Sequence, residues 1–537
     1  MKRLLVLLVL VMAVTLLVGP ASAQGEKIVT IICTQEADTL NPSYTNMWFA
    51  GILGDFYLSP TWAFDDNLAP VPMLVTEIPT QENGGVNEDG TVFTLHFRDD
   101  VFWSDGEPIT AADFYFTYEM IMAEGNLVIS RYPWDTNVAS VEMPDEYTIV
   151  VTFTAPFAPY LASLSMYVYP EHVLRPVFDA EGTIDNAEWN RAPVVGSGPF
   201  VFSEWQAGSH ILFTRNEHYW GDPAILDSVF IRFVPDDAAQ VAALINGEAE
   251  VGTFVAYSDV PQLVDAGLEY VLVSSGFNEG IYFNMESPIT SELAVRQAIR
   301  AAFPRQLIVD EMMYGLTYVP QTYWDGTPYN NPDIVLTSYD LAEAARLLDE
   351  AGWVDTNGDG TRDKNGVELI LRYGSTTRQI RQDVKAIVQQ HFAEVGIGME
   401  SISEDSTIFF AGFADGGTVA VGNFEIAEWS SRGSFPDPNT SRFLCAEIPT
   451  EETPEGANYT RYCEPDVEAL FQEQSRTMDR DARIEIFHQI GALMDEDVVW
   501  FGVWYDPDLW VLSDRLVNVR LSGASPFWNS GYWDISE

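Results

Sequence analysis

Alternating apolar and polar residues occur in several short stretches of the chain, and each of these stretches predicts a β-strand. Residues 92–98, VFTLHFR, alternate strictly, whereas residues 27–34, KIVTIICT, are dense in β-branched side chains. A glycine-bearing turn within 195–216 separates two more predicted strands. The remaining predicted strands are 148–154, 228–234, 279–285, 367–374 and 397–404.

Between these strands, apolar residues recur at helical spacing. In the segment 292–303 they share one face of a helix, at Val295, Ala298, Ile299, Ala302 and Phe303. Thr110 and Asp113 have the spacing of an N-terminal cap for a helix over 110–122. Further helices are predicted over 236–247, 340–353 and 379–396. Because strands and helices alternate throughout, we expect an α/β protein with more than one lobe.

The N-terminus has the pattern of a secretory signal peptide. Lys2 and Arg3 precede an apolar run of about 15 residues, which is short for a membrane span. The small residues of 21–23 then provide a cleavage site, so residues 1–23 are predicted to be a signal peptide. No later stretch is apolar for long enough to cross a bilayer. We therefore expect a soluble protein exported to the periplasm or the cell exterior.

The charge of the chain narrows the possible partners. Its 537 residues include 80 acidic and 27 basic ones, which gives a net charge of −53. Such a surface repels phosphate backbones, so nucleic-acid binding is excluded. Two interpretations of the charge stay open at this point: a strongly solvated surface suited to a saline or acidic habitat, or attraction of cationic substrates.

Motifs for catalysis are missing from the sequence. The six histidines have no metal-helix spacing, and neither a P-loop nor a dinucleotide fingerprint is present. The GSG at 196–198 is not a nucleophile elbow and is better interpreted as a turn. An enzyme is disfavoured, and we expect no cofactor and no metal site. The 69 aromatic residues (15 Trp, 23 Tyr and 31 Phe) favour either core packing or a ligand cleft lined with rings.

The segment 355–366, DTNGDGTRDKNG, resembles the first half of a calcium loop. Asp355, Asn357 and Asp359 fit its first three ligand positions, but the twelfth position, where a bidentate glutamate is required, is Gly366. A predicted strand follows in place of the second helix. We therefore interpret the segment as an acidic surface turn.

Three cysteines remain in an exported chain. Cys445 and Cys463 are 18 residues apart around a polar loop, and we predict a disulfide between them. Cys33 lies in an apolar strand and is predicted to be a buried free thiol.

Several segments together resemble the extracellular solute-binding proteins of family 5, the peptide- and nickel-type receptors of ABC importers. The resemblance covers nearly all of the chain after the signal peptide. It rests most clearly on FRDDVFWSDGEPITAADFYFTYE at 97–119, on VGSGPFVFSEWQAGSHILFTRNEHYWG at 195–221, on YFNMESPITSELAVRQAIRAAF at 282–303 and on YDLAEAARLLDEAGW at 339–353.

This resemblance implies a class II periplasmic-binding-protein fold whose lobes close on a ligand by hinge motion. Lobe I would comprise 24–65, 196–272 and 507–537. Lobe II would be an insertion over 66–195, and lobe III would span 273–506. The implied partners are a small-molecule or oligopeptide ligand and the permease subunits of an ABC transporter, and the receptor is expected to be a monomer.

The resemblance also indicates candidate ligand-binding residues, beginning with the stretch 427–438. Trp429, Ser430 and Ser431 lie on the strand whose backbone would pair with a bound peptide. The family's amine-binding aspartate position falls on or near Arg432, which would favour an anionic group instead. Asp437 is the nearest carboxylate downstream.

Other candidates come from loops that border the cleft in this family. These are Glu36, Tyr44 and Trp48 from the first turn, with Phe277 and Asn278 at the crossover between lobes. Arg378 or Arg381 could meet a peptide carboxylate. Oligopeptide binding is the favoured function; an oligosaccharide or a metal chelate is the alternative ligand, and a secreted hydrolase or a calcium-tuned adhesion module is a distant one.

Overall fold

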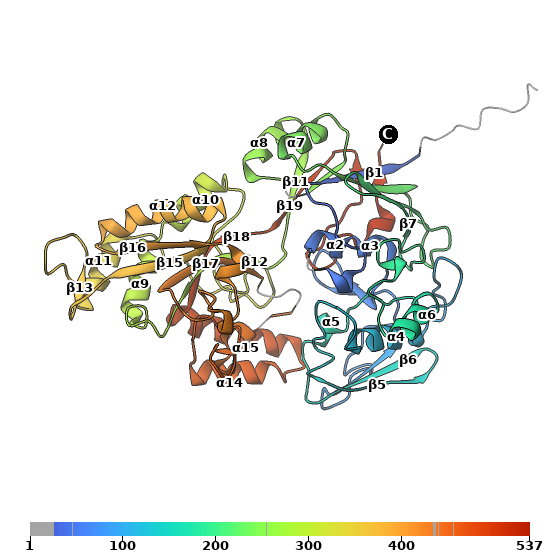
Figure 1. Ribbon diagram of the computed structural model, residues 1–537, viewed down its shortest axis with the longest axis horizontal. Coiled ribbons are helices and arrows are strands. Elements are labelled where there is room, and N and C mark those ends of the chain that lie inside the picture. Colours follow the sequence, from blue (N-terminus) through green and yellow to red (C-terminus); the bar gives the residue numbers. More distant parts are fainter. Residues whose placement is uncertain are drawn as a thin grey trace, which may run out of the picture.

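Three β-sheets organise the chain in a computed structural model (Figure 1). The structure describes residues 26–45, 47–253, 255–432, 437–438, 440–454 and 456–536. The predicted signal peptide, residues 1–23, lies outside the described residues. No helix in the described part is both long and apolar enough to cross a membrane. We use lobe I, lobe II and lobe III for the parts built around the seven-, three- and five-stranded sheets.

Lobe I contains a mixed sheet in the strand order β11-β19-β10-β1-β9-β8-β7. Its first strand is parallel to both neighbours, whereas the C-terminal strand β19 is antiparallel to β10 and β11. Two short helices, α2 (Trp48–Ile52) and α3 (Gly54–Tyr57), lead from the first strand toward lobe II. The strands are β1 (Ile28–Cys33), β7 (Phe200–Gln206), β8 (His210–Arg215), β9 (Ser228–Phe233), β10 (Val251–Thr253), β11 (Glu269–Val273) and β19 (Asp508–Leu512), and the helices α7 (Asp237–Ile245) and α8 (Val260–Asp265) connect them.

Lobe II carries an antiparallel sheet in the order β4-β6-β5 with helices against it. One continuous apolar core runs from lobe I into lobe II, from Val29 through Phe114 to Trp533, so these two lobes form one packed unit. The elements of lobe II are β4 (Val92–His96), α4 (Ala111–Met122), β5 (Val138–Asp145), β6 (Thr148–Phe153), α5 (Tyr160–Ser163) and α6 (Glu171–Glu181), and a small hairpin, β2 (Trp62–Phe64) with β3 (Pro70–Pro72), precedes them.

Lobe III contains a sheet in the order β16-β15-β17-β12-β18 and has two apolar cores of its own. Helices α14 and α15 extend from it toward lobe II (Figure 1). Its strands are β12 (Phe277–Phe283), β15 (Ile370–Thr376), β16 (Gly398–Glu404), β17 (Ile426–Arg432) and β18 (Trp500–Tyr505). Its helices are α9 (Leu293–Ala302), α10 (Arg305–Met312), α11 (Leu341–Glu350), α12 (Gln379–Glu394), α13 (Ser406–Phe409), α14 (Pro465–Gln474) and α15 (Arg480–Glu496).

The chain passes between lobes I and III twice. One crossover joins β11 to β12 through residues 274–276, and the other joins β18 to β19 through residues 506–507. The Tyr505 hydroxyl links the two, since it shares a 2.5 Å hydrogen bond with the Ser274 hydroxyl. These crossovers place the ends of β12, β17 and β18 next to lobe I.

The predicted secondary structure is largely confirmed. Helix α4 begins with the expected capping box, in which the Thr110 side chain accepts from Ala112 and Asp113 accepts from the backbone of Thr110. The predicted apolar face of 292–303 is fully buried. The pattern-based prediction left out β18 and β19, because the run WFGVWY and the strand after it are buried on both faces and have no alternation.

Two local features of the sequence also have a defined structure. Cys445 and Cys463 form a disulfide with a Cα–Cα distance of 4.9 Å, and Cys33 is buried and free. The acidic segment 355–366 is a turn in which Asp355 accepts hydrogen bonds from Gly358 and Gly360. Among the described residues, no group of three or more His, Cys, Asp or Glu side chains could hold a metal ion.

Candidate functional site

A cavity of about 750 Å³ lies where lobes I and III meet. Trp48 and Trp510 line it from lobe I, and Phe277, Arg378 and Ser430 line it from lobe III. The second crossover supplies further lining residues, because Asp506 and Asp508 flank Pro507 there. The cavity thus joins both lobes at the crossovers, where movement of one lobe against the other would change its shape.

The strand β17 presents part of its backbone toward this cavity. Its pairing with β12 continues to Arg432, but its pairing with β15 ends at Glu428. Strand β15 stays with β16 as far as Thr376 and then leads into Arg378, so β15 and β17 diverge. On that side, the backbone groups of residues 429–431 therefore have no strand partner among the described residues.

Aromatic rings form much of the cavity wall. The rings of Trp48 and Trp510 are in tilted contact, with centroids 5.8 Å apart. Phe277 and Tyr257 extend the wall around the crossovers. The Trp510 side chain is 1% exposed, and its Nε1 has no hydrogen-bond partner within the described part of the chain. The cavity therefore combines large apolar surfaces with a buried donor that is not used.

Two carboxylates of the second crossover lie in the cavity lining. Burial raises the pKa of Asp508 to about 7, and the nearby Arg432 guanidinium partly opposes this effect. Burial also raises the pKa of Asp506, while Arg378 lowers it. The Oδ2 atom of Asp508 is buried and makes no geometric hydrogen bond to a described residue, but the nearby Ser275 hydroxyl also lowers the pKa of this carboxyl group. Asp508 is therefore a half-buried acid of the cavity lining, with Arg432 and Ser275 as its polar neighbours.

Arg432 spans the junction between the lobes. Its Nε donates to the carbonyl of Ser275 at 3.0 Å, and its Nη2 donates to the carbonyl of Gly523 in lobe I at 3.3 Å. The guanidinium also lies over the Phe277 ring, 5.8 Å from its centroid. Arg432 lines a second cavity, of about 410 Å³, that opens toward Tyr132 of lobe II.

A buried charge network supports the lobe III side of the site. The Arg381 guanidinium donates to both carboxylate oxygens of Glu279, at 2.6 and 2.9 Å. The Tyr373 hydroxyl donates to Glu428 at 2.7 Å. Burial raises the pKa of both Glu279 and Glu428, and Arg381 acts against the rise in each case. Arg381 is therefore engaged inside lobe III, which leaves Arg378 as the arginine of this helix start that lines the cavity.

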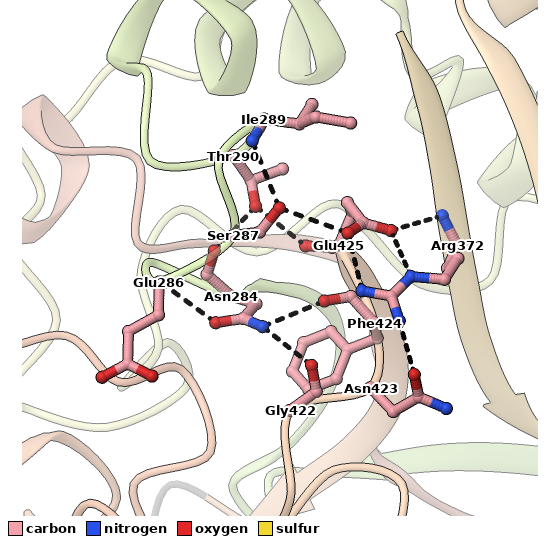
Figure 2. Close-up of polar contacts among 10 residues, drawn as sticks. All are labelled: Asn284, Glu286, Ser287, Ile289, Thr290, Arg372, Gly422, Asn423, Phe424 and Glu425. Atoms are coloured by element: carbon pink, nitrogen blue, oxygen red, sulfur yellow. Dashed lines mark hydrogen bonds and ion pairs between the residues drawn. The ribbon is translucent and has the colours of Figure 1, made fainter. Parts of the chain in front are cut away.

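A second polar cluster holds strands β15 and β17 together at the ends that lie away from the cavity (Figure 2). Glu425, directly before β17, accepts hydrogen bonds of 2.8 Å from the backbone and the guanidinium of Arg372 on β15. The Ser287 hydroxyl donates to the same carboxylate, and Asn284 donates to the carbonyls of Gly422 and Phe424. This cluster fixes the strands far from the cavity, so the divergence of β15 and β17 is confined to the cavity end.

The residues predicted from the sequence divide into two groups. Trp48, Phe277, Arg378 and Ser430 line the cavity between the lobes, and Arg432 lines the second one. Three others lie behind the wall. Trp429 stacks on Tyr282 with ring centroids 3.6 Å apart, the Asn278 amide donates to the Tyr323 carbonyl, and the Ser431 hydroxyl bonds the Tyr323 hydroxyl.

The remaining predicted residues have partners away from both cavities. Glu36 accepts from Trp205 and Gly208, and the Tyr44 hydroxyl donates to Asn126. Asp437 forms an ion pair with the buried Arg483. These contacts occupy the polar groups of all three side chains within the fold itself.

Apart from Trp48, sequence reasoning missed the lobe I and crossover side of the cavity, notably Tyr257, Asp506, Asp508 and Trp510. The stretch WYDPDLW at 504–510 could have indicated a binding site, because two carboxylates and a proline interrupt an otherwise aromatic and apolar run. Its position beside β10 and β11 depends on strand pairing over more than 200 residues, which local pattern does not reveal.

The fold and the cavity between its lobes are those of a solute-binding protein. A model for the middle part of the bacterial extracellular solute-binding proteins of family 5 matches residues 69–446. The chain belongs to this family.

Particular relatives share most of the chain. The oligopeptide-binding protein AppA of Bacillus subtilis is 24% identical over 466 residues, covering 84% of this chain and 82% of AppA. A putative ABC transporter peptide-binding protein of Brucella ovis is 28% identical, covering 78% and 76%. The solved structure of NikA from Brucella suis with Fe(III)-EDTA has a TM-score of 0.79 at 21% identity, covering 95% of this chain and 100% of NikA.

These comparisons confirm the predicted family and the α/β fold of lobes with an inserted domain. The family, AppA and the Brucella ovis protein are all named for binding, which confirms the prediction of a binding protein rather than an enzyme.

Proposed function

We propose that this protein is the extracytoplasmic receptor of an ABC importer, that it binds oligopeptides in the cavity between lobes I and III, and that it delivers them to a membrane permease. Relatives named as oligopeptide-binding and ABC transporter peptide-binding proteins support this role. The receptor acts outside the cytoplasm after its signal peptide is removed, and it acts as a monomer.

The observation that carries the proposal is the free backbone edge of β17. An extended peptide beside residues 429–431 would add a strand where β15 has turned away. Main-chain hydrogen bonds would then provide affinity that does not depend on which side chains the peptide carries. Arg378 lines the same cavity, and no ion pair of its side chain exists among the described residues. We assign Arg378 to the peptide's terminal carboxylate, which a guanidinium can bind through charge-assisted hydrogen bonds.

Closure of the lobes converts binding into a signal. Residues 274–276 and 506–507 are the two chain segments that would have to bend when lobe III moves toward lobe I. A ligand that contacts both lobes favours the closed state by its differential affinity for that state. The permease then distinguishes the loaded receptor from the empty one.

A metal chelate is the second candidate ligand, because the NikA structure was solved with Fe(III)-EDTA. Arg378 and Arg432 could contact the carboxylates of such a chelate. The described residues hold no cluster for a bare metal ion, so a metal would enter only inside its chelator.

A backbone-methylation experiment tests the proposal. An alanine-rich pentapeptide and its N-methylated counterpart are compared by isothermal titration calorimetry. We expect the methylated peptide to bind at least tenfold more weakly, because it has lost main-chain donors. Mass spectrometry of ligand released from the purified receptor provides an independent readout. Stabilisation by oligosaccharides or Fe(III)-EDTA, with none by any peptide, would refute the peptide function.

A further inference from the structure

The cavity between lobes I and III has an unbalanced charge. Four of its lining residues are carboxylates, Glu311, Asp383, Asp506 and Asp508, and one is a cation, Arg378. Arg378 lies near Asp506, where it lowers that group's pKa. Glu311, Asp383 and Asp508 then remain without a cationic residue of the cavity lining to balance them.

Asp508 is the carboxylate of the cavity lining that lies near both Arg432 and the Ser275 hydroxyl, and both lower its pKa. Its Oδ2 is buried and forms no geometric hydrogen bond to a described residue, while the residue as a whole is half-buried. The positive charge of Arg432 acts on Asp508 from nearby, while the Nε and Nη2 of that guanidinium donate to the carbonyls of Ser275 and Gly523. Because Asp508 lines the cavity, a cationic group of the ligand would add to the stabilisation that Arg432 and Ser275 give this carboxylate.

The walls around this carboxylate suit an elongated group. Trp48, Tyr257 and Phe277 line the cavity with half-buried rings that can pack against methylene groups, and the almost fully buried Trp510 contacts Trp48. The face of an aromatic ring also attracts an organic cation within about 6 Å. A group with an apolar stem and a cationic head matches both the walls and the carboxylates.

We propose that this cavity is a specificity subsite for a lysine or arginine side chain of the bound peptide. The alkyl stem lies along the aromatic wall, and the ammonium or guanidinium group meets Asp508 and Asp506. This inference rests on the proposed peptide-binding function and specifies which peptides the receptor prefers. On this proposal, the excess of carboxylates in the cavity serves to recognise a positively charged side chain of the peptide.

A side chain fits this subsite better than the amino terminus of a peptide does. A terminal ammonium has no methylene stem, so it would make less contact with the rings of Tyr257 and Phe277 in the cavity lining. An anionic side chain would face a cavity whose carboxylates outnumber its one arginine. Norleucine matches the lysine stem but lacks the charge, and it therefore isolates the contribution of the carboxylates.

Calorimetry with matched peptides tests the subsite. The set is N-acetyl-Ala-Ala-X-Ala-Ala with a free carboxyl terminus, where X is lysine, arginine, norleucine or glutamate, measured at about 0.15 M salt to limit long-range attraction. Acetylation removes the terminal amine, so the side chain carries the sole positive charge. We expect the lysine and arginine peptides to bind at least tenfold more tightly than the norleucine peptide, and the glutamate peptide to bind most weakly.

Receptor variants localise the effect. In Asp508→Asn, and separately in Asp506→Asn, the preference for lysine over norleucine should fall to within about threefold while norleucine binding is retained. Asp359→Asn is the matched control, because it removes one negative charge from the exposed turn of 355–366. That control should keep the full preference. Thermal melting of each variant verifies folding, and the use of two cavity variants keeps the test valid if one of them is unstable.

The results that would contradict the subsite differ from those that would contradict the peptide-receptor function. Equal binding of lysine, norleucine and glutamate peptides would overturn the subsite and leave the peptide receptor intact. A preference lost equally in Asp359→Asn would attribute it to overall charge and also overturn the subsite. A preference seen only for peptides with a free amino terminus would assign the cation to that terminus instead. Binding of no peptide at all would overturn both the subsite and the proposed function.

Discussion

Glu279 and Arg381 form an ion pair that is almost completely buried beneath the cavity. Breaking such a pair leaves one charge without solvent or partner, which typically costs about 3–5 kcal/mol. We expect Arg381→Met to lower the unfolding free energy of lobe III by about this amount, measured by urea denaturation followed through tryptophan fluorescence.

A double variant tests whether the loss comes from the stranded charge. Glu279→Gln with Arg381→Met removes both charges, so it should recover a large part of the stability lost in the single variant. If the double variant is as unstable as Arg381→Met, packing rather than charge is the cause.

Arg378, the residue directly before helix α12, is the proposed contact for the peptide's terminal carboxylate, and a substitution tests this role. Arg378→Gln should weaken binding of a peptide with a free carboxyl terminus by about tenfold, because a charge-assisted hydrogen bond is lost. The same peptide with an amidated terminus should bind wild type and variant equally. Calorimetry on these four combinations would contradict the assignment if the amidated peptide lost as much affinity as the free one.

At the residue scale, the sequence predicted part of the site for a physical reason. Phe277 and Arg378 lie just before a predicted strand and a predicted helix, Trp48 and Ser430 were indicated by the family resemblance, and all four line the cavity. Asp508 could not be found in this way. Its position in the cavity lining arises from strands that meet over long sequence distances.

At the element scale, the disulfide closes a loop at the base of α14. Joining Cys445 to Cys463 restricts the unfolded chain, and a loop of this length is worth about 3 kcal/mol in the chain-entropy model. Replacing both cysteines by serine should lower the unfolding free energy by about this amount. Added reductant should reduce the midpoint of wild type in urea but leave the double variant unchanged, and equal sensitivity of both proteins would contradict the prediction.

Elements with a clear period were predicted well, and those without one were not. Helix α9 and strand β4 each expose one face, so their apolar residues repeat visibly. Strands β18 and β19 are covered on both sides, so the apolar runs WFGVWY and LWVL show no alternation. The divergence of β15 from β17, which creates the free edge, depends on three sheet neighbours at once and has no local signal.

At the scale of the whole molecule, buried carboxyl groups determine how stability changes with pH. Burial raises the pKa of Asp55 and of Asp113 to about 6, and that of Asp508 to about 7. The unfolded chain has ordinary carboxyl groups with pKa values near 4. Between about pH 5 and pH 7.5 the folded protein therefore holds protons that the unfolded chain releases.

The sign of the effect follows from linkage. Where the folded state binds more protons, the unfolding free energy falls as pH rises. We expect the melting temperature to decrease steadily from pH 5 to pH 7.5. Surface repulsion from the net charge acts in the same direction, so the scan is repeated in 1 M salt, where it is screened. Part of the slope should remain in high salt and should be smaller in Asp508→Asn, whereas a melting temperature that rises with pH would contradict the assignment.

The position of β19 has a consequence for how the protein is made. This strand, Asp508–Leu512, follows every strand of lobe III in the sequence, yet it lies inside the lobe I sheet, between β10 and β11. Lobe I therefore cannot complete its sheet until the ribosome has passed these residues, and lobe III likewise waits for β18, which ends just before them. A chain shortened before residue 508 would leave β10 and β11 without their shared neighbour. Completion of the receptor has to wait for this late strand, which is compatible with a polypeptide that crosses a membrane before it folds.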